Sequence, residues 1–309
     1  MTEASARISA DANYFARIGA WLGERFPPAN GILSLVLFFA VAAVMQPGGH
    51  IFTQWTNWLG GVLLWGHFFV LRIFDEHKDY ETDLRNYPER VIQSGVVRLG
   101  EIRRLGYIVV AAQIAFSCYR GGGVGFPLYA WAAMFGYTCL MGAEFFLGEW
   151  LQKRLLVYAA THMLVMPLMA IWSAALAGAA VFDARVVVLA LLFFCAGFAY
   201  EVFRKIRAPE GEIAGIDTYS SILGFRLASV LAFAFTTGFW LCALALLPWQ
   251  RQQHAALAAL AIFAALHLYL AYKLIAFCRR PSVAGARGND KLSGLYVVLL
   301  LGTLIAVAA

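Results

Sequence analysis

A short, strongly acidic segment follows the second long apolar run of this chain. Residues 75–83 read DEHKDYETD and contain five acids. Carboxylates placed so close together repel one another unless a cation lies among them. If the segment continues the preceding run as a helix, Glu76, Asp79 and Asp83 share one face and Asp75 flanks it. Mg²⁺ binds such carboxylates together with water and phosphate, so the segment predicts a Mg²⁺ site for a substrate with a phosphate head and an apolar tail.

A second polar stretch, YEVFRKIRAPEGEIAGIDTYSSILG at 200–224, follows the sixth apolar run. Two readings of it stay open, and we favour a mixture of both. Its acids could hold a second Mg²⁺, or its basic residues could bind phosphate directly as fixed cations. The acidic candidates are Glu210, Glu212 and Asp217, and the basic candidates are Arg204, Lys205 and Arg207.

Four further residues are candidates because polar groups at the edge of an apolar bundle are often functional. Glu144 is a candidate base or acceptor-positioning group, and His162 a candidate to orient an acceptor or take a proton. The structural alternative for His162 is a hydrogen bond between helices. Tyr219 and Ser220 could contact phosphate, or belong to the capped start of the next helix.

The elements that must position these residues are long apolar helices. Of the 309 residues, 61% are hydrophobic and only 14% charged, well below the roughly 25% of a soluble domain. The apolar runs are close to the length that crosses a bilayer as a helix. We therefore expect an all-α polytopic membrane protein, with an N-terminal amphipathic segment at 1–30 and one transmembrane domain at 31–309. The nine expected spans are 31–47, 57–74, 105–119, 126–147, 154–178, 185–203, 221–247, 254–277 and 292–309.

Basic residues are distributed unevenly between the connections. They concentrate after spans 2, 4, 6 and 8, whereas the other connections carry only Arg120, Arg185 and Arg251. The positive-inside rule then places the N-terminus and both polar stretches in the cytoplasm. We expect a multi-pass protein of a bacterial inner (cytoplasmic) membrane, in contact with membrane lipid. The net charge of +6 is accounted for by this asymmetry, so no nucleic-acid partner is expected.

The acidic segment resembles the NDxxDxxxD signature of the UbiA superfamily of intramembrane prenyltransferases. Asp75 stands in place of the Asn, Glu76 in place of the first Asp, and Asp79 and Asp83 match directly. ERVIQSG at 89–95 is similar to the RPxxSG segment that follows in the family. Nine helices, with polar loops after helices 2 and 6, are also the family's layout.

Other basic residues extend the resemblance, and one motif departs from it. The pair at Lys153 and Arg154 matches a basic pair common at the start of the family's fifth helix, and Arg90 matches the Arg of RPxxSG. These three residues are therefore expected to bind substrate. The family's second motif, DxxxD after helix 6, has no counterpart in the stretch at 200–224.

The resemblance implies a Mg²⁺-dependent prenyltransferase that moves an isoprenyl group from an isoprenyl diphosphate to a lipophilic acceptor. Asp79, Asp83, Glu144 and His162 are then the expected catalytic residues. The altered second motif keeps two alternatives open: a terpene cyclase acting on one isoprenyl diphosphate, and a non-catalytic binder or transporter of lipid phosphates.

Overall fold

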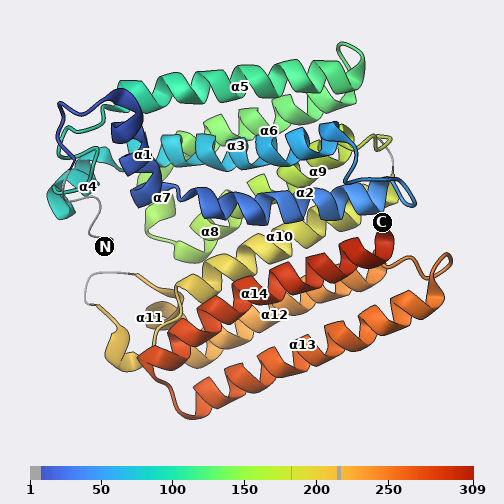
Figure 1. The fold of residues 1–309 in the computed structure, drawn as a ribbon. Helices are drawn as coiled ribbons and strands as arrows, with labels where there is room; N and C mark the ends of the chain where they lie inside the picture. Colours follow the sequence, from blue (N-terminus) through green and yellow to red (C-terminus); the bar gives the residue numbers. More distant parts are fainter. Residues whose placement is uncertain (1–7, 182, 214–216) are drawn as a thin grey trace.

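A computed structural model describes residues 8–181, 183–213 and 217–309, and its regular structure within these ranges is helical. Long helices lie side by side in one bundle, with short helices at its left-hand end in Figure 1. The long helices are α2 (Gly31–Met45), α3 (Trp55–Lys78), α5 (Leu99–Gly121), α6 (Phe126–Gly142), α8 (Leu155–Met163) with α9 (Val165–Leu176), α10 (Ala184–Arg204), α12 (Phe225–Ala245), α13 (Gln253–Arg279) and α14 (Val283–Ala308). The short helices are α1 (Tyr14–Arg25), α4 (Tyr80–Asn86), α7 (Gly148–Gln152) and α11 (Tyr219–Leu223), with single turns at Pro28–Asn30, Glu144–Phe146 and Pro209–Gly211.

Helices occupy every segment expected to span the membrane, and among the described residues seven candidate spans are both long and apolar enough to cross it. The chain is therefore an integral membrane protein, while the count of nine crossings stays a prediction. The expected span at 154–178 is interrupted at Leu164, between α8 and α9. Pro167 explains the break, because its ring clashes with the carbonyl four residues earlier and removes a helical hydrogen bond.

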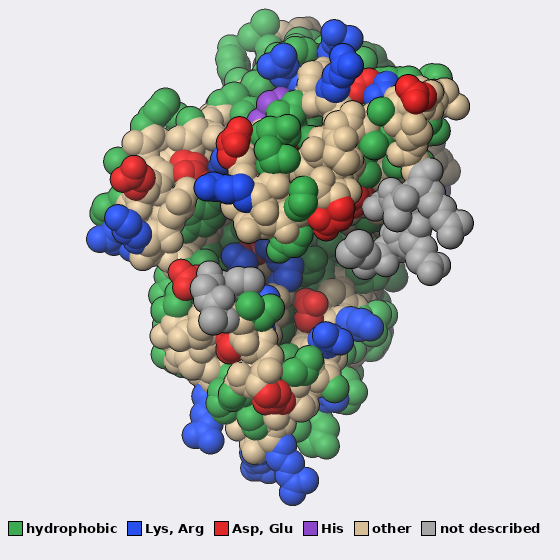
Figure 2. Space-filling model, turned by 90° about the vertical axis from the view of Figure 1, so that its left-hand side faces the viewer, with side chains coloured by type: hydrophobic (Ala, Val, Ile, Leu, Met, Phe, Trp, Pro, Cys, Tyr) green, Lys and Arg blue, Asp and Glu red, His purple; other side chains and the backbone are tan. Residues whose placement is uncertain are grey.

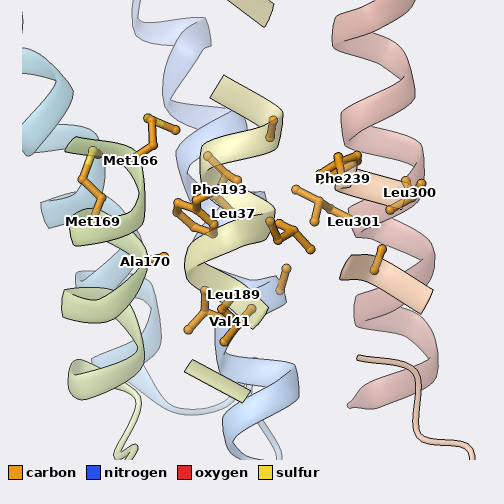
Figure 3. Packing of buried hydrophobic residues seen from close by; sticks show 14 of the residues in the cluster. Leu37, Val41, Met166, Met169, Ala170, Leu189, Phe193, Phe239, Leu300 and Leu301 are labelled. Atoms are coloured by element: carbon orange, nitrogen blue, oxygen red, sulfur yellow. The ribbon is translucent and has the colours of Figure 1, made fainter. Parts of the chain in front are cut away.

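The core lies where α2, α9, α10, α12 and α14 meet. Figure 3 shows their apolar side chains packed together at this meeting point. Leu37, Val41, Met169, Phe193 and Leu301 are each at most 3% exposed. These helices carry apolar residues around much of their circumference, as expected of helices with neighbours on several sides. The result is a closely packed scaffold whose polar ends form the candidate site.

Helix α1 lies within the segment expected to be amphipathic, and it begins at Tyr14 after the Asn13 side chain caps Ala16 N at 2.9 Å. Its inner face inserts Trp21, which is fully buried, edge-on against Phe69 of α3 at a centroid distance of 5.6 Å. The residue after α1, Phe26, stacks on Trp65 at 5.3 Å. Aromatic packing of this kind holds α1 firmly on α3.

The opposite end of α1 is fixed by an ion pair. Arg17 reaches Glu101 at the start of α5 at 2.6 Å and also donates to the Val96 carbonyl at 2.8 Å. The outer face leaves Phe15 83% exposed, as an amphipathic helix at a bilayer surface would. Helices α1 and α4 lie at the same end of the bundle as α11, so both polar stretches are brought to one end (Figure 1).

Candidate active site

The acidic segment is a bent continuation of α3. Helix α3 ends at Lys78, Asp79 lies at the bend, and α4 resumes at Tyr80. Backbone hydrogen bonds still cross the bend, from Asp79 N to the Asp75 carbonyl and from Asp83 N to the Asp79 carbonyl, both at 2.8 Å. The expected helical continuation is therefore present, but the bend redirects the side chains on its two sides.

Two of the acids are neutralised by arginines. Glu76 is 1% exposed, and its Oε1 accepts from Arg25 Nε at 2.6 Å and from Arg72 Nη2 at 2.8 Å. Asp83 is paired with Arg25 Nη2 at 3.1 Å and with Arg90 Nη1 at 2.6 Å. Charge-assisted bonds of this length neutralise both carboxylates, although the buried Glu76 Oε2 has no partner in the described ranges. Arg90, expected to bind substrate, is thus engaged with the acidic segment itself.

Asp75 and Asp79 are more open. The Asp75 side chain is 47% exposed and lies 3.8 Å from the Lys78 ammonium. Asp79 has no ion pair within 4.0 Å in the described ranges, and it is exposed. Partial loss of hydration around its carboxylate raises the pKa of Asp79; Lys78 opposes this, whereas the negative charges of Asp75 and Asp83 reinforce it. Asp75 and Asp79, together with the exposed Glu81, are therefore the carboxylates of the segment that no arginine in the described ranges engages.

Lys78 also links this segment to the region after α6. Its ammonium donates to the Tyr158 hydroxyl at 2.9 Å and lies 3.9 Å from Glu144. The Tyr158 ring stacks on His162 with centroids 3.9 Å apart, and His162 Nδ1 lies 2.8 Å from the Tyr158 carbonyl. The structure thus gathers Glu144, His162 and the acidic segment around one lysine.

Glu144 is placed by an unusual turn. Glu144, Phe145 and Phe146 all have positive φ, from 47° to 59°, in the left-handed region that residues with a Cβ seldom adopt. The turn brings the Phe145 ring edge-on to His162 at 6.0 Å. Gly148 leaves space for the Glu144 side chain, because a Cβ at position 148 would lie 2.1 Å from a Glu144 carboxylate oxygen. Strain of this kind is typical of functional sites.

The second polar stretch contains an ion-pair cluster. Glu201, 9% exposed, is paired with Arg204 at 2.6 Å and with Lys205 at 2.8 Å. Beside it, between the end of α10 and the start of α14, lies a pocket of about 310 Å³. Three arginines and one acid are among its lining residues, which are Phe203, Arg204, Ile206, Arg207, Ala208, Gly211, Ile213, Val283, Ala286, Arg287 and Asp290. Such a pocket is suited to bind an anion.

The capping alternative is confirmed for the start of α11. The Thr218 hydroxyl accepts from Ser221 N at 2.9 Å and donates to the Glu212 carboxylate at 2.9 Å. The Ser220 hydroxyl accepts from Arg207 N at 2.7 Å, which fixes the loop that carries the arginine. Tyr219 is fully buried, and its hydroxyl has no partner in the described part of the chain.

The remaining candidates are exposed. Glu210 and Asp217 lie on the surface of the loop, and neither has an ion pair in the ranges described. Lys153 and Arg154 are also exposed, and Arg154 lies 4.3 Å over the Trp150 ring. The structure does not place this basic pair in the cluster around Lys78.

A hollow opens at the polar end of the bundle. In Figure 2 it lies between the upper part of the molecule, which contains α1 and α3–α8, and the lower part with α10–α14, and Lys and Arg side chains are visible inside. The acidic segment belongs to the upper part and the arginine pocket to the lower part. Carboxylates and guanidinium groups are therefore presented at the same end of the bundle from separate halves of the chain.

This arrangement coincides with a match to a known family. Residues 34–289 match the UbiA prenyltransferase family. The chain belongs to this family. A solved structure of a digeranylgeranylglyceryl phosphate synthase in membranes is similar, with a TM-score of 0.63, 16% identity, and coverage of 94% of this chain and 98% of that chain. At that identity the similarity establishes the UbiA fold alone. No curated protein matches the chain.

Only some carboxylates of the acidic segment of this UbiA protein could bind Mg²⁺. In the described ranges no group of three or more His, Cys, Asp or Glu side chains is arranged to hold a metal ion. Mg²⁺ needs only one or two carboxylates when water and phosphate complete its shell. Asp75 and Asp79 meet that requirement, whereas Glu76 and Asp83 are already bonded to arginines.

Several residues of the site were not among the sequence candidates, including Arg25, Arg72, Lys78, Tyr158 and Arg287. Arg72 precedes Glu76 by four residues and Lys78 follows Asp75 by three, and this helical spacing could have indicated both ion pairs. Arg25 and Arg287 come from distant parts of the chain, and no local pattern indicates their contacts.

Proposed function

We propose that the chain is a Mg²⁺-dependent intramembrane prenyltransferase that transfers an isoprenyl group from an isoprenyl diphosphate to a lipophilic acceptor. The observation that carries the proposal is that the open carboxylates Asp75 and Asp79 and an arginine pocket lie at the same end of a UbiA bundle. An allylic diphosphate requires positive charge at its leaving oxygens, and the arginine pocket supplies it.

Asp75 and Asp79 would hold Mg²⁺, which when bound supplies positive charge to the leaving diphosphate. Arg207 and Arg287 bind the diphosphate oxygens as fixed cations, since guanidinium groups match phosphate geometry. The C–O bond of the allylic carbon then breaks, and its electron pair leaves with the diphosphate. The acceptor forms the new bond to the allylic cation, and a proton leaves the acceptor.

Glu144 and His162 are the proposed proton-handling groups. Both lie beside Lys78, within the cluster that also contains the Tyr158 ring. His162 Nε2 is buried and has no partner in the described ranges, so one ring nitrogen is available for an acceptor. Lys78 holds this cluster next to the metal-binding carboxylates.

The proposed orientation places the N-terminus and this polar end in the cytoplasm of a bacterium, in the inner membrane. Arg85, Arg98, Arg103 and Arg104 lie in or near the acidic connection, and they support this orientation through the positive-inside rule. Donor and acceptor would then enter from the membrane and the cytoplasmic surface.

The test is product analysis by mass spectrometry after incubation of purified protein with C10 to C20 isoprenyl diphosphates, Mg²⁺ and membrane-lipid extracts. Prenylated lipid products that require both donor and extract are expected. Cyclic terpenes formed from the donor alone would indicate cyclisation instead. Binding of donors without any diphosphate release would contradict an enzymatic role.

A further inference from the structure

Arg25 contacts acids on both sides of the bend in the acidic segment. Its Nε lies 2.6 Å from Glu76 of α3, and its Nη2 lies 3.1 Å from Asp83 of α4. Asp79, at the bend, is located between these two acids in sequence. One planar guanidinium therefore bridges the two helices that meet at a proposed metal ligand.

The contacts are well enclosed. The Glu76 side chain is 1% exposed and the Arg25 and Asp83 side chains are 17% and 13% exposed. The second oxygen of Glu76, Oε2, is buried and has no partner in the described ranges, so it is not presented to a cation from solvent. Ion pairs that are shielded from water hold their geometry better than exposed ones.

Arg25 is itself held in place by the helix that carries it. It is the last residue of α1, four residues after the buried Trp21, and Phe26 directly after it is also buried. Glu24 accepts from Val91 N at 3.3 Å, so α1 also contacts the loop after α4. The guanidinium is thus presented to the acidic segment by a rigidly packed helix end.

We propose that Arg25 is a positioning residue that clamps α3 to α4 and so sets the position of Asp79. Arg72 and Arg90 complete the clamp, each from one side, through Glu76 and Asp83 respectively. This assignment gives Glu76 and Asp83 a structural task, and leaves Asp75 and Asp79 to the cation. Its catalytic consequence rests on the proposed function, whereas the clamp itself does not.

The test uses the full chain in nanodiscs and compares Arg25→Ala with Arg85→Ala. Arg85 is a matched control because it lies in α4, is exposed, and makes no ion pair in the described ranges. Hydrogen exchange of the amides at 80–90 should become about tenfold faster in Arg25→Ala and stay unchanged in Arg85→Ala. This readout needs no substrate, so it decides the clamp even if the wild-type protein releases no diphosphate.

Diphosphate release is the second readout. A shift of Asp79 by about 1 Å can lower turnover about 100-fold, so kcat should fall strongly in Arg25→Ala. Arg25→Lys, which keeps the charge but loses the fork that reaches two carboxylates, should recover only part of it; it also serves if Arg25→Ala does not fold. Unchanged exchange in both Arg25 variants would overturn the clamp. Faster exchange with normal kcat would overturn the positioning role.

Discussion

Replacing the arginines of the pocket between α10 and α14 should weaken donor binding by amounts that depend on their ion pairing. Arg207 and Arg287 line the pocket, and neither has a carboxylate within 4.0 Å in the described ranges. Arg204 and Lys205 are bound to Glu201 at 2.6 and 2.8 Å. Arg207 and Arg287 are therefore available to a phosphate oxygen, while Glu201 already neutralises much of the charge of Arg204 and Lys205.

The magnitude follows from this difference. A hydrogen bond to a charged group contributes about 1.5–3 kcal/mol, and about 1.4 kcal/mol corresponds to a tenfold change in affinity. Arg287 is exposed and the pocket is open to water, so the lower value applies. Arg207→Ala and Arg287→Ala should each raise the Kd about tenfold, whereas Lys205→Ala should raise it by less than about threefold.

The assay is calorimetric binding of a non-hydrolysable isoprenyl thiodiphosphate to the protein in nanodiscs. Arg280→Ala is the matched control, because Arg280 is exposed in the connection between α13 and α14, a few residues before the pocket, and does not line it. If the pocket arginines only establish membrane orientation, all four variants will keep the wild-type Kd. Equal Kd values for Arg207→Ala and Arg280→Ala would therefore refute the reasoning.

Three further predictions concern the turn after α6 and the attachment of α1. Gly148→Ala should displace the Glu144 carboxylate, since a Cβ would lie 2.1 Å from it. Turnover in a diphosphate-release assay should then fall by about tenfold or more. Gly136→Ala should leave turnover unchanged, because a Cβ there meets nothing within 4 Å. Trp21→Ala should lower the free energy of unfolding by about 3–5 kcal/mol in denaturant titrations, and Phe15→Ala, at an exposed position, should leave it unchanged. The hydrogen bond from Arg17 lowers the pKa of Glu101 below its usual 4.5. The stabilisation from this pair is therefore present above pH 4.5 and is lost as the pH falls through the lowered pKa. Glu101→Gln should remove this pH dependence from the rate of proteolysis at α1, and a pH profile like that of the wild type would contradict the prediction.

The long helices could be predicted from the sequence because apolar runs of this length have few alternatives to a membrane-spanning helix. The break at Leu164 is explained in the same way by Pro167. The turn at 144–146 could not be predicted, because the expected span at 126–147 continues through it. Its left-handed residues are not glycines, and tertiary contacts must offset their local cost.

The candidate site was predictable in its residue types and not in its pairing. The spacing of Glu76, Asp79 and Asp83 predicted a shared face, but the bend at Asp79 and the contacts of Arg25 divide the three acids between different partners. Arg25 is 51 residues from Glu76 and 58 from Asp83, and helical periodicity carries no information over such separations. Pairing across the chain depends on how α1 packs on α3.

The most direct test of the account is a Mg²⁺ titration of diphosphate release by wild-type protein and Asp79→Asn, with a C20 isoprenyl diphosphate and a membrane-lipid extract. The account predicts release that is abolished by EDTA, restored by Mg²⁺, and lowered about 100-fold or more by Asp79→Asn, because loss of a metal ligand removes several kcal/mol of leaving-group stabilisation. Release that persists in EDTA, or an Asp79→Asn variant with wild-type turnover, would contradict it.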